Sequence, residues 1–326
     1  MKEIVVPQSC EGQKAEKFIK KFLSEAPLGF IYKAFRKKDI KANGHWIPKD
    51  HILHGGDVVR IYVSDQQLED FKKPRPVTKK EFPYPIAYED ENVLIVNKPK
   101  GLLVYGDKTG VRETLGNAVL DYLYLKGEYD PDIPGFVPSP AHRLDRNTSG
   151  LVVYGKTDAA LKELTELFKD RSQIKKTYLA LVDGNIDAPG KIDLPLWKDA
   201  QNGRVYVKSL QNGGKTALTL YRPISHIGEE YTLVEAELVS GRTHQIRVHF
   251  ASIKHPLVGD EKYGDFASCR KVKALTGLDS QFLHAESITF LHMPPVLKKL
   301  ENKTIRSKIP DNLTKVIEIL SQSIQN

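Results

Sequence analysis

The sequence of 326 residues contains only two cysteines, Cys10 and Cys269, which lie far apart. Neither belongs to a CxxC pair, which excludes a disulfide framework and the usual cysteine-based zinc and redox motifs. No stretch approaches the roughly 20 apolar residues that a membrane-spanning helix requires. Residues 1–3 include an acidic residue, Glu3, and no apolar signal region begins there. We therefore expect a soluble, cytoplasmic protein with no membrane partner.

Internal repeats and low-complexity tracts are also lacking, so no repeat architecture is indicated. Hydrophobic residues make up 40% and charged residues 28% of the chain, a balance typical of a globular protein with a buried core. At this length two domains are the natural expectation.

Positive charge, in contrast, is present in excess and is concentrated near the N-terminus. The chain carries a net charge of +8, and residues 14–49, with ten lysines and arginines against three acids, account for +7 of it. A concentrated basic surface attracts polyanions and releases their counterions on binding. A solvated basic face without a partner is the plainer interpretation, but the confinement of the charge to one segment favours RNA.

The N-terminal segment, residues 1–70, has the pattern of two helices followed by a small hairpin sheet. Apolar residues recur at helical spacing over residues 18–23, and Ile31, Ala34 and Phe35 share one face of a second predicted helix. The basic residues cluster towards the C-terminal end of that second helix, where they also suit the helix dipole.

A hairpin turn signal, Asn43-Gly44, follows the second predicted helix, and alternating apolar residues over 58–63 predict a strand. The layout resembles the S4 RNA-binding domain. The resemblance implies that basic residues of the second helix and of the hairpin contact RNA. They are Lys33, Arg36, Lys37, Lys38 and Lys41.

Residues 71–85 are charged and rich in proline without a sustained hydrophobic period, and we interpret them as a semi-rigid linker. Residues 86–326 have the pattern of a larger domain of mixed helices and strands. Strands are predicted at residues 92–98, 151–154, 177–182 and 231–239. A helix is predicted at 158–168, with Leu161, Leu164 and Leu167 on its buried side. The expected fold class is α+β with a mainly antiparallel sheet.

A polar segment, residues 140–150, comes directly before the apolar strand predicted at 151–154, and its sequence is PAHRLDRNTSG. Loops held by a rigid strand are where catalytic side chains often collect. Asp145 stands between Arg143 and Arg146, whose positive charges attract a carboxylate. The residues alone leave two interpretations open, a catalytic loop or an Asp–Arg cluster that only stabilises a turn.

Residues 142–150, HRLDRNTSG, resemble the catalytic signature of the RluA-type pseudouridine synthases. Further blocks similar to that family occur along the chain, and their order is the same as in the family. They are residues 96–101 (VNKPKG), 176–180 (KTYLA), 241–249 (GRTHQIRVH), 255–260 (HPLVGD) and 283–285 (LHA). With the S4-like segment ahead of them, they are similar to the branch that includes RluC and RluD. Asn147 stands where relatives often have Asp.

The resemblance implies an isomerase that converts uridine in structured RNA to pseudouridine, without cofactor, metal or obligate protein partner. Large-subunit ribosomal RNA is the expected substrate, and transfer RNA is the alternative. Asp145 matches the catalytic carboxylate, which acts either as a nucleophile at C1′ or, as we favour, as a general base at C2′. Arg242 matches its ion-pair partner, and Tyr178 matches a tyrosine that stacks on the uracil.

Four other residues are assigned to the substrate. Arg143 matches an arginine that fills the space left by the extruded nucleotide. Leu283 is expected to line the uracil pocket, and Lys176 to contact a phosphate. Arg146 is placed with them in the substrate-binding set.

Two other functions are weighed against the isomerase. A silent RNA-binding assembly factor would lose Asp145 or Arg242, and the sequence retains both. A metal-dependent phosphoesterase would need ligands among the histidines, together with Asp145 or Asp260. The histidines in question are His142, His244, His249 and His255. The spacing of five between His244 and His249 places them on different helix faces, so we interpret these histidines as structural or adjacent to RNA, with no metal site.

Overall fold

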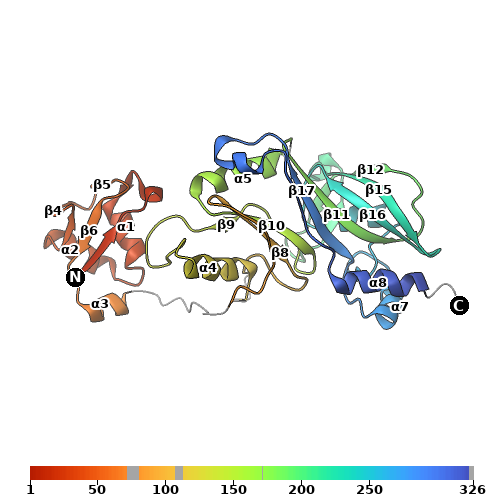
Figure 1. Ribbon diagram of the computed structural model, residues 1–326, viewed down its shortest axis with the longest axis horizontal. Coiled ribbons are helices and arrows are strands. Elements are labelled where there is room, and N and C mark those ends of the chain that lie inside the picture. Colours follow the sequence, from red (N-terminus) through yellow and green to blue (C-terminus); the bar gives the residue numbers. More distant parts are fainter. Residues whose placement is uncertain (72–80, 107–112, 171, 323–326) are drawn as a thin grey trace. The chain divides into compact units, whose positions relative to one another are not determined.

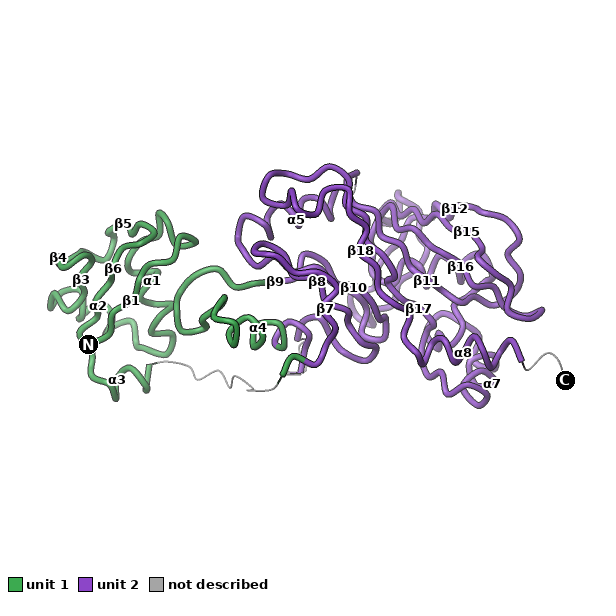
Figure 2. Tube along the Cα trace, viewed as in Figure 1, with its two compact units in different colours: residues 1–82, 118–138 green, residues 83–117, 139–326 purple. Residues whose placement is uncertain are grey.

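The computed structural model describes residues 1–71, 81–106, 113–170 and 172–322. The chain divides into two compact units, shown in Figure 2. Unit 1 comprises residues 1–82 and 118–138, and unit 2 comprises residues 83–117 and 139–326. Most of the predicted linker falls on residues 72–80, which lie outside the described residues.

Residues 118–138 cluster with the N-terminal part of the chain, although the sequence pattern assigned them to the larger domain. Two hydrogen bonds show why. The Cys10 thiol donates to the carbonyl of Pro134 at 3.1 Å, and the amide of Phe136 donates to the Ser9 hydroxyl at 3.0 Å. Sequence periodicity carries no information on such long-range contacts.

Unit 1 is built on a four-stranded antiparallel sheet, with strand order β1-β6-β3-β4. The strands are β1 (Lys2–Val5), β3 (Ile40–Ala42), β4 (His45–Trp46) and β6 (Val58–Ile61). Asn43 and Gly44 join β3 to β4 with φ values of 50° and 84°, which confirms the predicted two-residue turn with left-handed backbone at both positions.

Helices α1 (Ala15–Phe22) and α2 (Leu28–Arg36) cover this sheet. The predicted apolar face of α2 is confirmed, because Ile31, Ala34 and Phe35 are buried in the core of the unit. The short elements of unit 1 are η1 (Gln8–Cys10), β2 (Gln13–Lys14), β5 (Ile52–Leu53) and α3 (Asp65–Asp70).

Unit 2 is built on a ten-stranded sheet, visible in the right half of Figure 1. Its main path runs β12-β15-β16-β11-β17-β10-β8-β7, with β18 pairing β17 and β9 pairing β10. The bounds are β7 (Ile86–Glu89), β8 (Val93–Lys98), β9 (Ser139–Pro140), β10 (Ser149–Gly155), β11 (Ile174–Asp183), β12 (Gly190–Asp193), β15 (Leu218–Ile227), β16 (Tyr231–Leu238), β17 (Leu283–Phe290) and β18 (Thr304–Arg306). Among the described residues, β10–β17 is its one parallel pairing. The mixed helix and strand composition with a mainly antiparallel sheet is as predicted.

Helix α5 (Asp158–Asp170) packs on β8 and β10. Its predicted buried stripe is partly wrong. Leu164 is buried as expected, but the other fully buried side chains are Ala160 and Phe168, while Leu161 and Leu167 are half-buried. The helix approaches the strand closely at Gly155, where a Cβ would lie 2.6 Å from the Leu161 Cα, and this contact sets which face turns inward.

The other end of the sheet is covered by α7 (Phe266–Thr276) and α8 (Asp311–Gln322), which lie side by side in Figure 1. The remaining elements are α4 (Leu115–Leu125), β13 (Leu196–Lys198), β14 (Val205–Val207), η2 (Leu210–Asn212), α6 (Gln245–Ser252) and η3 (Pro295–Leu300). None of the helices in the described ranges is both long and apolar enough to span a membrane.

Candidate functional site

The loop that carries Asp145 connects β9 to β10 at the point where β10 meets β17. Gly150, in β10, has φ of 112°, and a Cβ there would lie 2.2 Å from the carbonyl oxygen of Ala285. Only glycine fits this close approach of two backbones. The contact therefore fixes the exit of the loop, just after Asp145, against β17.

Lys98, at the end of β8, anchors the same loop through hydrogen bonds to backbone carbonyls. Its buried ammonium donates to the carbonyl oxygens of Pro99 and Leu102 at 2.9 Å each and of Arg146 at 3.0 Å. Three carbonyls match the three hydrogens of a protonated lysine. Burial lowers the pKa of Lys98 to about 7, while the nearby Asp145 carboxylate opposes this shift. Lys98 thus anchors the backbone one residue past Asp145.

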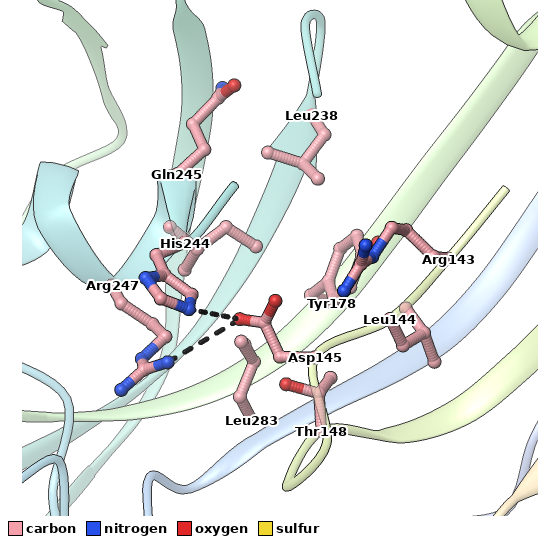
Figure 3. Close-up of a pocket in the computed structure, with 11 residues that line it drawn as sticks. Arg143, Leu144, Asp145, Thr148, Tyr178, Leu238, His244, Gln245, Arg247 and Leu283 are labelled. Atoms are coloured by element: carbon pink, nitrogen blue, oxygen red, sulfur yellow. Dashed lines mark ion pairs between the residues drawn. The ribbon is translucent and has the colours of Figure 1, made fainter. Parts of the chain in front are cut away.

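A small pocket of about 60 Å³ opens beside Asp145, as shown in Figure 3. At roughly 10–15 Å³ per water it has room for about four or five water molecules, which suits one small ring rather than a whole nucleotide. The lining residues come from the loop, from β11, β16 and β17, and from the start of α6. They are Arg143, Leu144, Asp145, Thr148, Tyr178, Leu238, His244, Gln245, Ile246, Arg247 and Leu283.

Arg247 is the arginine that faces Asp145. Its guanidinium Nη1 lies 3.6 Å from Asp145 Oδ2, while Nε and Nη2 donate to the two oxygens of the buried Asp260 at 2.7 and 2.8 Å. Burial alone would lower the pKa of Arg247, but the hydrogen bonds and attraction to Asp260 raise it. Asp260 therefore holds a permanent positive charge in place next to the Asp145 carboxylate.

His244 approaches the same carboxylate oxygen, with Nε2 at 3.9 Å from Asp145 Oδ2. Its Nδ1 lies 2.7 Å from the Tyr263 hydroxyl, which accepts a hydrogen bond from the Val205 amide at 2.9 Å. The hydroxyl keeps its own hydrogen, which it can donate to Nδ1. Burial lowers the pKa of His244 to about 4, so the ring is neutral near pH 7. The tautomer with its hydrogen on Nε2 directs that hydrogen to the Asp145 carboxylate and leaves Nδ1 to accept from Tyr263.

Four predicted site residues are brought together in this pocket from three distant parts of the sequence. Asp145 and Arg143 come from the loop, Tyr178 from β11 and Leu283 from β17. In Figure 3, Arg143 and Tyr178 lie on one side of Asp145, and His244 and Arg247 lie on the other. The cross-strand neighbours of Tyr178 are small alanines, which leaves space beside its ring.

Arg242 is not the ion-pair partner of Asp145 in this structure. Its side chain is exposed, its Nε donates to the carbonyl of Thr216 at 3.1 Å, and it does not line the pocket. The backbone of His244 is left-handed, with φ of 54°, so residues before and after it face different ways. The prediction of Arg242 from the GRTHQIR block was therefore wrong. A buried arginine needs a carboxylate partner, and Asp260 of the HPLVGD block was a signal of such a pair in the sequence.

Two other predicted substrate contacts also lie outside the pocket. Lys176 is buried, with Nζ 5.4 Å from the centre of the Phe168 ring, and does not present its charge at the pocket. The exposed Arg146 turns away and donates from Nε to the carbonyl of Gly101 at 3.1 Å. Both side chains therefore contribute to packing or to loop anchoring in the structure, in place of the predicted contact to substrate.

Three of the four histidines make hydrogen bonds to the fold itself. His142 accepts from the Val153 amide, His249 contacts Thr219 and the carbonyl of Leu194, and His255 contacts the carbonyl of Asp183. In the described ranges, no three His, Cys, Asp or Glu side chains gather as a metal site would require. The structural interpretation is confirmed for these three, and His244 is the exception that reaches the pocket.

The predicted RNA contacts of unit 1 lie around the C-terminal end of α2 and along β3. Lys33, Arg36, Lys37 and Lys38 are exposed, and Lys41 is half-buried. Two of the lysines lie over exposed aromatic rings, Lys38 at 5.4 Å from the centre of Trp46 and Lys41 at 5.3 Å from that of Tyr62. This surface combines cations with aromatic faces.

Comparison with known proteins identifies the family. Residues 92–252 match the model described as RNA pseudouridylate synthase. The chain is 33% identical over 325 residues, 96% of each chain, to "Ribosomal large subunit pseudouridine synthase C" of Vibrio cholerae. It is 34% identical over 297 residues, 88% of this chain and 87% of the relative, to "Ribosomal large subunit pseudouridine synthase D" of Yersinia pestis.

A solved structure supports the fold. The structure titled "Human RNA Pseudouridylate Synthase Domain Containing 4" superposes with a TM-score of 0.57 at 22% identity, over 72% of this chain and 92% of that chain. These matches confirm the resemblance that the ordered sequence blocks indicated. The chain belongs to the RNA pseudouridylate synthase family and is an isomerase of that class.

Proposed function

We propose that this chain converts specific uridines of large-subunit ribosomal RNA to pseudouridine, with Asp145 as the catalytic carboxylate. The names of the two relatives support the choice of RNA. The position of Asp145 carries the assignment of the residue, since it is the one acid among the described residues that line the pocket. Acting on ribosomal RNA, the enzyme would work in the cytoplasm.

In the proposed mechanism, Asp145 acts as a general base at C2′ of the target ribose. Removal of the C2′ proton accompanies cleavage of the C1′–N1 bond and gives a glycal and a uracil anion. The uracil turns, its C5 bonds to C1′, and the proton returns to C2′. C5 then loses its hydrogen, and N1 gains one, so no oxidant, reductant or energy source is consumed.

The surrounding side chains divide the other tasks in this proposal. Both cationic and polar contacts of Asp145 are to Oδ2, and the other oxygen points away from them in Figure 3, towards the space for substrate. Tyr178 and Leu283 enclose the flat faces of the uracil. Arg143, which is exposed at the pocket, enters the space left in the RNA by the extruded base.

Unit 1 has the role of an S4-like RNA-binding module in this proposal. Its five basic residues and the adjacent Trp46 and Tyr62 supply phosphate contacts and stacking surfaces. Replacing Lys33, Arg36, Lys37, Lys38 and Lys41 by Gln should weaken RNA binding and reduce the salt slope of log K by about 0.7–0.9 for each phosphate that the variant no longer neutralises. Substitution is a cleaner test than deletion of residues 1–70, because residues 118–138 pack against that segment. An unchanged salt slope would show that the RNA binds elsewhere.

The substrate is tested by mapping pseudouridine in cellular RNA with and without the gene, and then with purified protein on unmodified transcripts. Loss of particular pseudouridines from large-subunit ribosomal RNA, restored by the wild-type gene and not by Asp145→Asn, is the expected result. Loss confined to transfer RNA would reject the proposed substrate. Restoration by Asp145→Asn would reject the proposed catalytic residue and favour an assembly role.

A further inference from the structure

A second cavity of about 480 Å³ lies beside the first in unit 2. It is lined by Leu196, Trp197, Lys198, Val205, Gly213, Lys215, Gly241, Arg242 and Thr243. Residues 241–243 line this cavity and residues 244–247 line the pocket of Asp145, so one continuous segment forms a wall of both. Its volume falls in the range of about 300–1,000 Å³ that small-ligand sites occupy.

The cavity is formed by strands that hold each other in place. Strands β13 and β14 pair antiparallel, and Leu196 exchanges two backbone hydrogen bonds of 2.9 Å with Lys215. The returning loop passes so close that a Cβ on Gly214 would lie 1.9 Å from the carbonyl of Lys208. These contacts fix the walls, so the site exists before a ligand arrives.

The charge of the cavity is positive. Lys198, Lys215 and Arg242 are exposed at its lining, and none of the described residues that line it is acidic. Arg242 is oriented by the bond from Nε to the carbonyl of Thr216, which uses one of its five donors. Three cations with no lining acid favour an anionic ligand.

An aromatic ring provides a stacking surface among these charges. The half-buried Trp197 lines the cavity, and its ring centre lies 6.2 Å from that of Tyr206 on the paired strand. Lys208 Nζ lies 4.3 Å from the centre of the Trp197 ring. Bases stack on such rings irrespective of their identity, and lysines beside them contact the phosphates.

We propose that this second cavity binds an unpaired nucleotide adjoining the target uridine, with its base against Trp197 and its phosphate among Lys198, Lys215 and Arg242. The inference rests on the proposed function. Proteins recognise specific RNA sequences mainly at loops and bulges, whose bases are unstacked, so a nucleotide next to the target is available for capture. The shared wall sets the two sites at adjacent positions along one strand.

A ligand in the cavity would also affect the contacts that connect β14 to Asp145 through Tyr263 and His244. Val205 lines the cavity, and its amide donates to Tyr263, which contacts His244. A nucleotide that steadies β14 would therefore steady the ring that faces the catalytic carboxylate. In this proposal, a nucleotide in the second cavity affects the position of the His244 ring as well as the affinity for RNA.

Fluorescence tests binding directly, because the chain has two tryptophans and Trp46→Phe leaves Trp197 as the single emitter. The full-length variant is titrated with a single-stranded uridine trinucleotide and, separately, with hexaglutamate. Quenching by the trinucleotide that weakens with salt and is diminished in Lys215→Gln is expected. No change with the trinucleotide, or an equal response to hexaglutamate, would overturn the proposal.

Steady-state kinetics provide the second test. Trp197→Ala should raise KM for unmodified large-subunit RNA by about 10- to 100-fold with little change in kcat. The matched control is Phe266→Ala, an exposed aromatic in the same unit with Arg270 4.9 Å above it. If Trp197→Ala does not fold, Lys198→Gln with Lys215→Gln replaces it.

The two tests separate the inference from the function on which it rests. An unchanged KM in a folded Trp197 variant that makes pseudouridine would overturn the subsite and leave the function intact. Quenching of the Trp46→Phe variant by the trinucleotide, together with a wild-type protein that makes no pseudouridine in large-subunit RNA, would overturn the proposed substrate and leave the subsite.

Discussion

The two cavities of unit 2 share a wall but differ in size and in the charge of their lining. The pocket at Asp145, of about 60 Å³, is lined by groups whose polar atoms are already held by the protein, as Arg247 is by Asp260. The cavity at Trp197 is about 480 Å³, and its cations are exposed. The first has the organisation expected of a site for chemistry, and the second that of a site for binding.

The difference arises within one short segment, residues 241–247. Arg242 points to the larger cavity and Arg247 to the smaller, and the left-handed backbone of His244 lies between them. Two arginines five residues apart thus lie in different cavities, on either side of the left-handed residue. The predictions below test whether that separation holds, beginning with the largest effect.

Asp145→Asn should reduce the rate of pseudouridine formation by about 10³-fold or more, because loss of a catalytic base removes the proton acceptor. Single-turnover assays on unmodified ribosomal RNA measure this rate. RNA affinity and urea unfolding should stay close to wild type. Asp187→Asn, at a carboxylate that is 85% exposed, is the matched control. Appreciable product from Asp145→Asn would remove the chemistry from the smaller pocket.

Arg247→Gln should lower both stability and activity, whereas Arg242→Gln should change RNA affinity alone. Without Arg247 the buried Asp260 carboxylate is deprived of its bidentate partner, which costs about 3 kcal/mol of unfolding free energy. Urea denaturation and kcat for both variants provide the comparison. Equal behaviour of the two arginines would refute the division of labour.

Tyr263→Phe should reduce kcat by about 10-fold with KM unchanged, because His244 loses the hydroxyl that fixes its tautomer. The phenyl ring keeps its packing between Arg247 and Arg204. Tyr206→Phe, at an exposed tyrosine of β14, serves as the control and should leave kcat as it is. A change in KM instead of kcat would place Tyr263 in binding.

The last prediction concerns the dependence of stability on pH at the buried His284. Burial lowers the pKa of His284 to about 4, below the unfolded value of 6.5. The unfolded chain therefore takes up the proton first, and stability falls as pH drops from about 6.5 to about 4. Urea unfolding at pH 7 and 5 should show a loss about 2 kcal/mol smaller in His284→Gln than in wild type. His45→Gln, at an exposed histidine, is the matched control variant.

Local structure was largely readable from the sequence. The Asn43-Gly44 turn and the buried face of α2 follow from backbone preference and helical period, which act within a few residues. The gathering of Arg143, Asp145, Tyr178 and Leu283 was predicted through family resemblance, since no local rule connects positions so far apart.

What sequence reasoning missed depends on tertiary geometry. The choice between Arg242 and Arg247 depends on the left-handed backbone at His244, a conformation that is uncommon for residues other than glycine and that the sequence pattern does not indicate. Lys176 was expected at a phosphate, but it is buried and its ammonium lies over the Phe168 ring of α5. The positions of these side chains depend on which surfaces come into contact in the folded protein. A local sequence pattern does not contain that information.

The amide of Val205 offers an observable that the geometry provides without any label at the catalytic centre. It stands at the far end of the hydrogen bonds that pass through Tyr263 and His244 towards Asp145. Its nuclear magnetic resonance shift should therefore change when RNA reaches Asp145. A single backbone signal on the hairpin would then record the state of the enzyme during a titration.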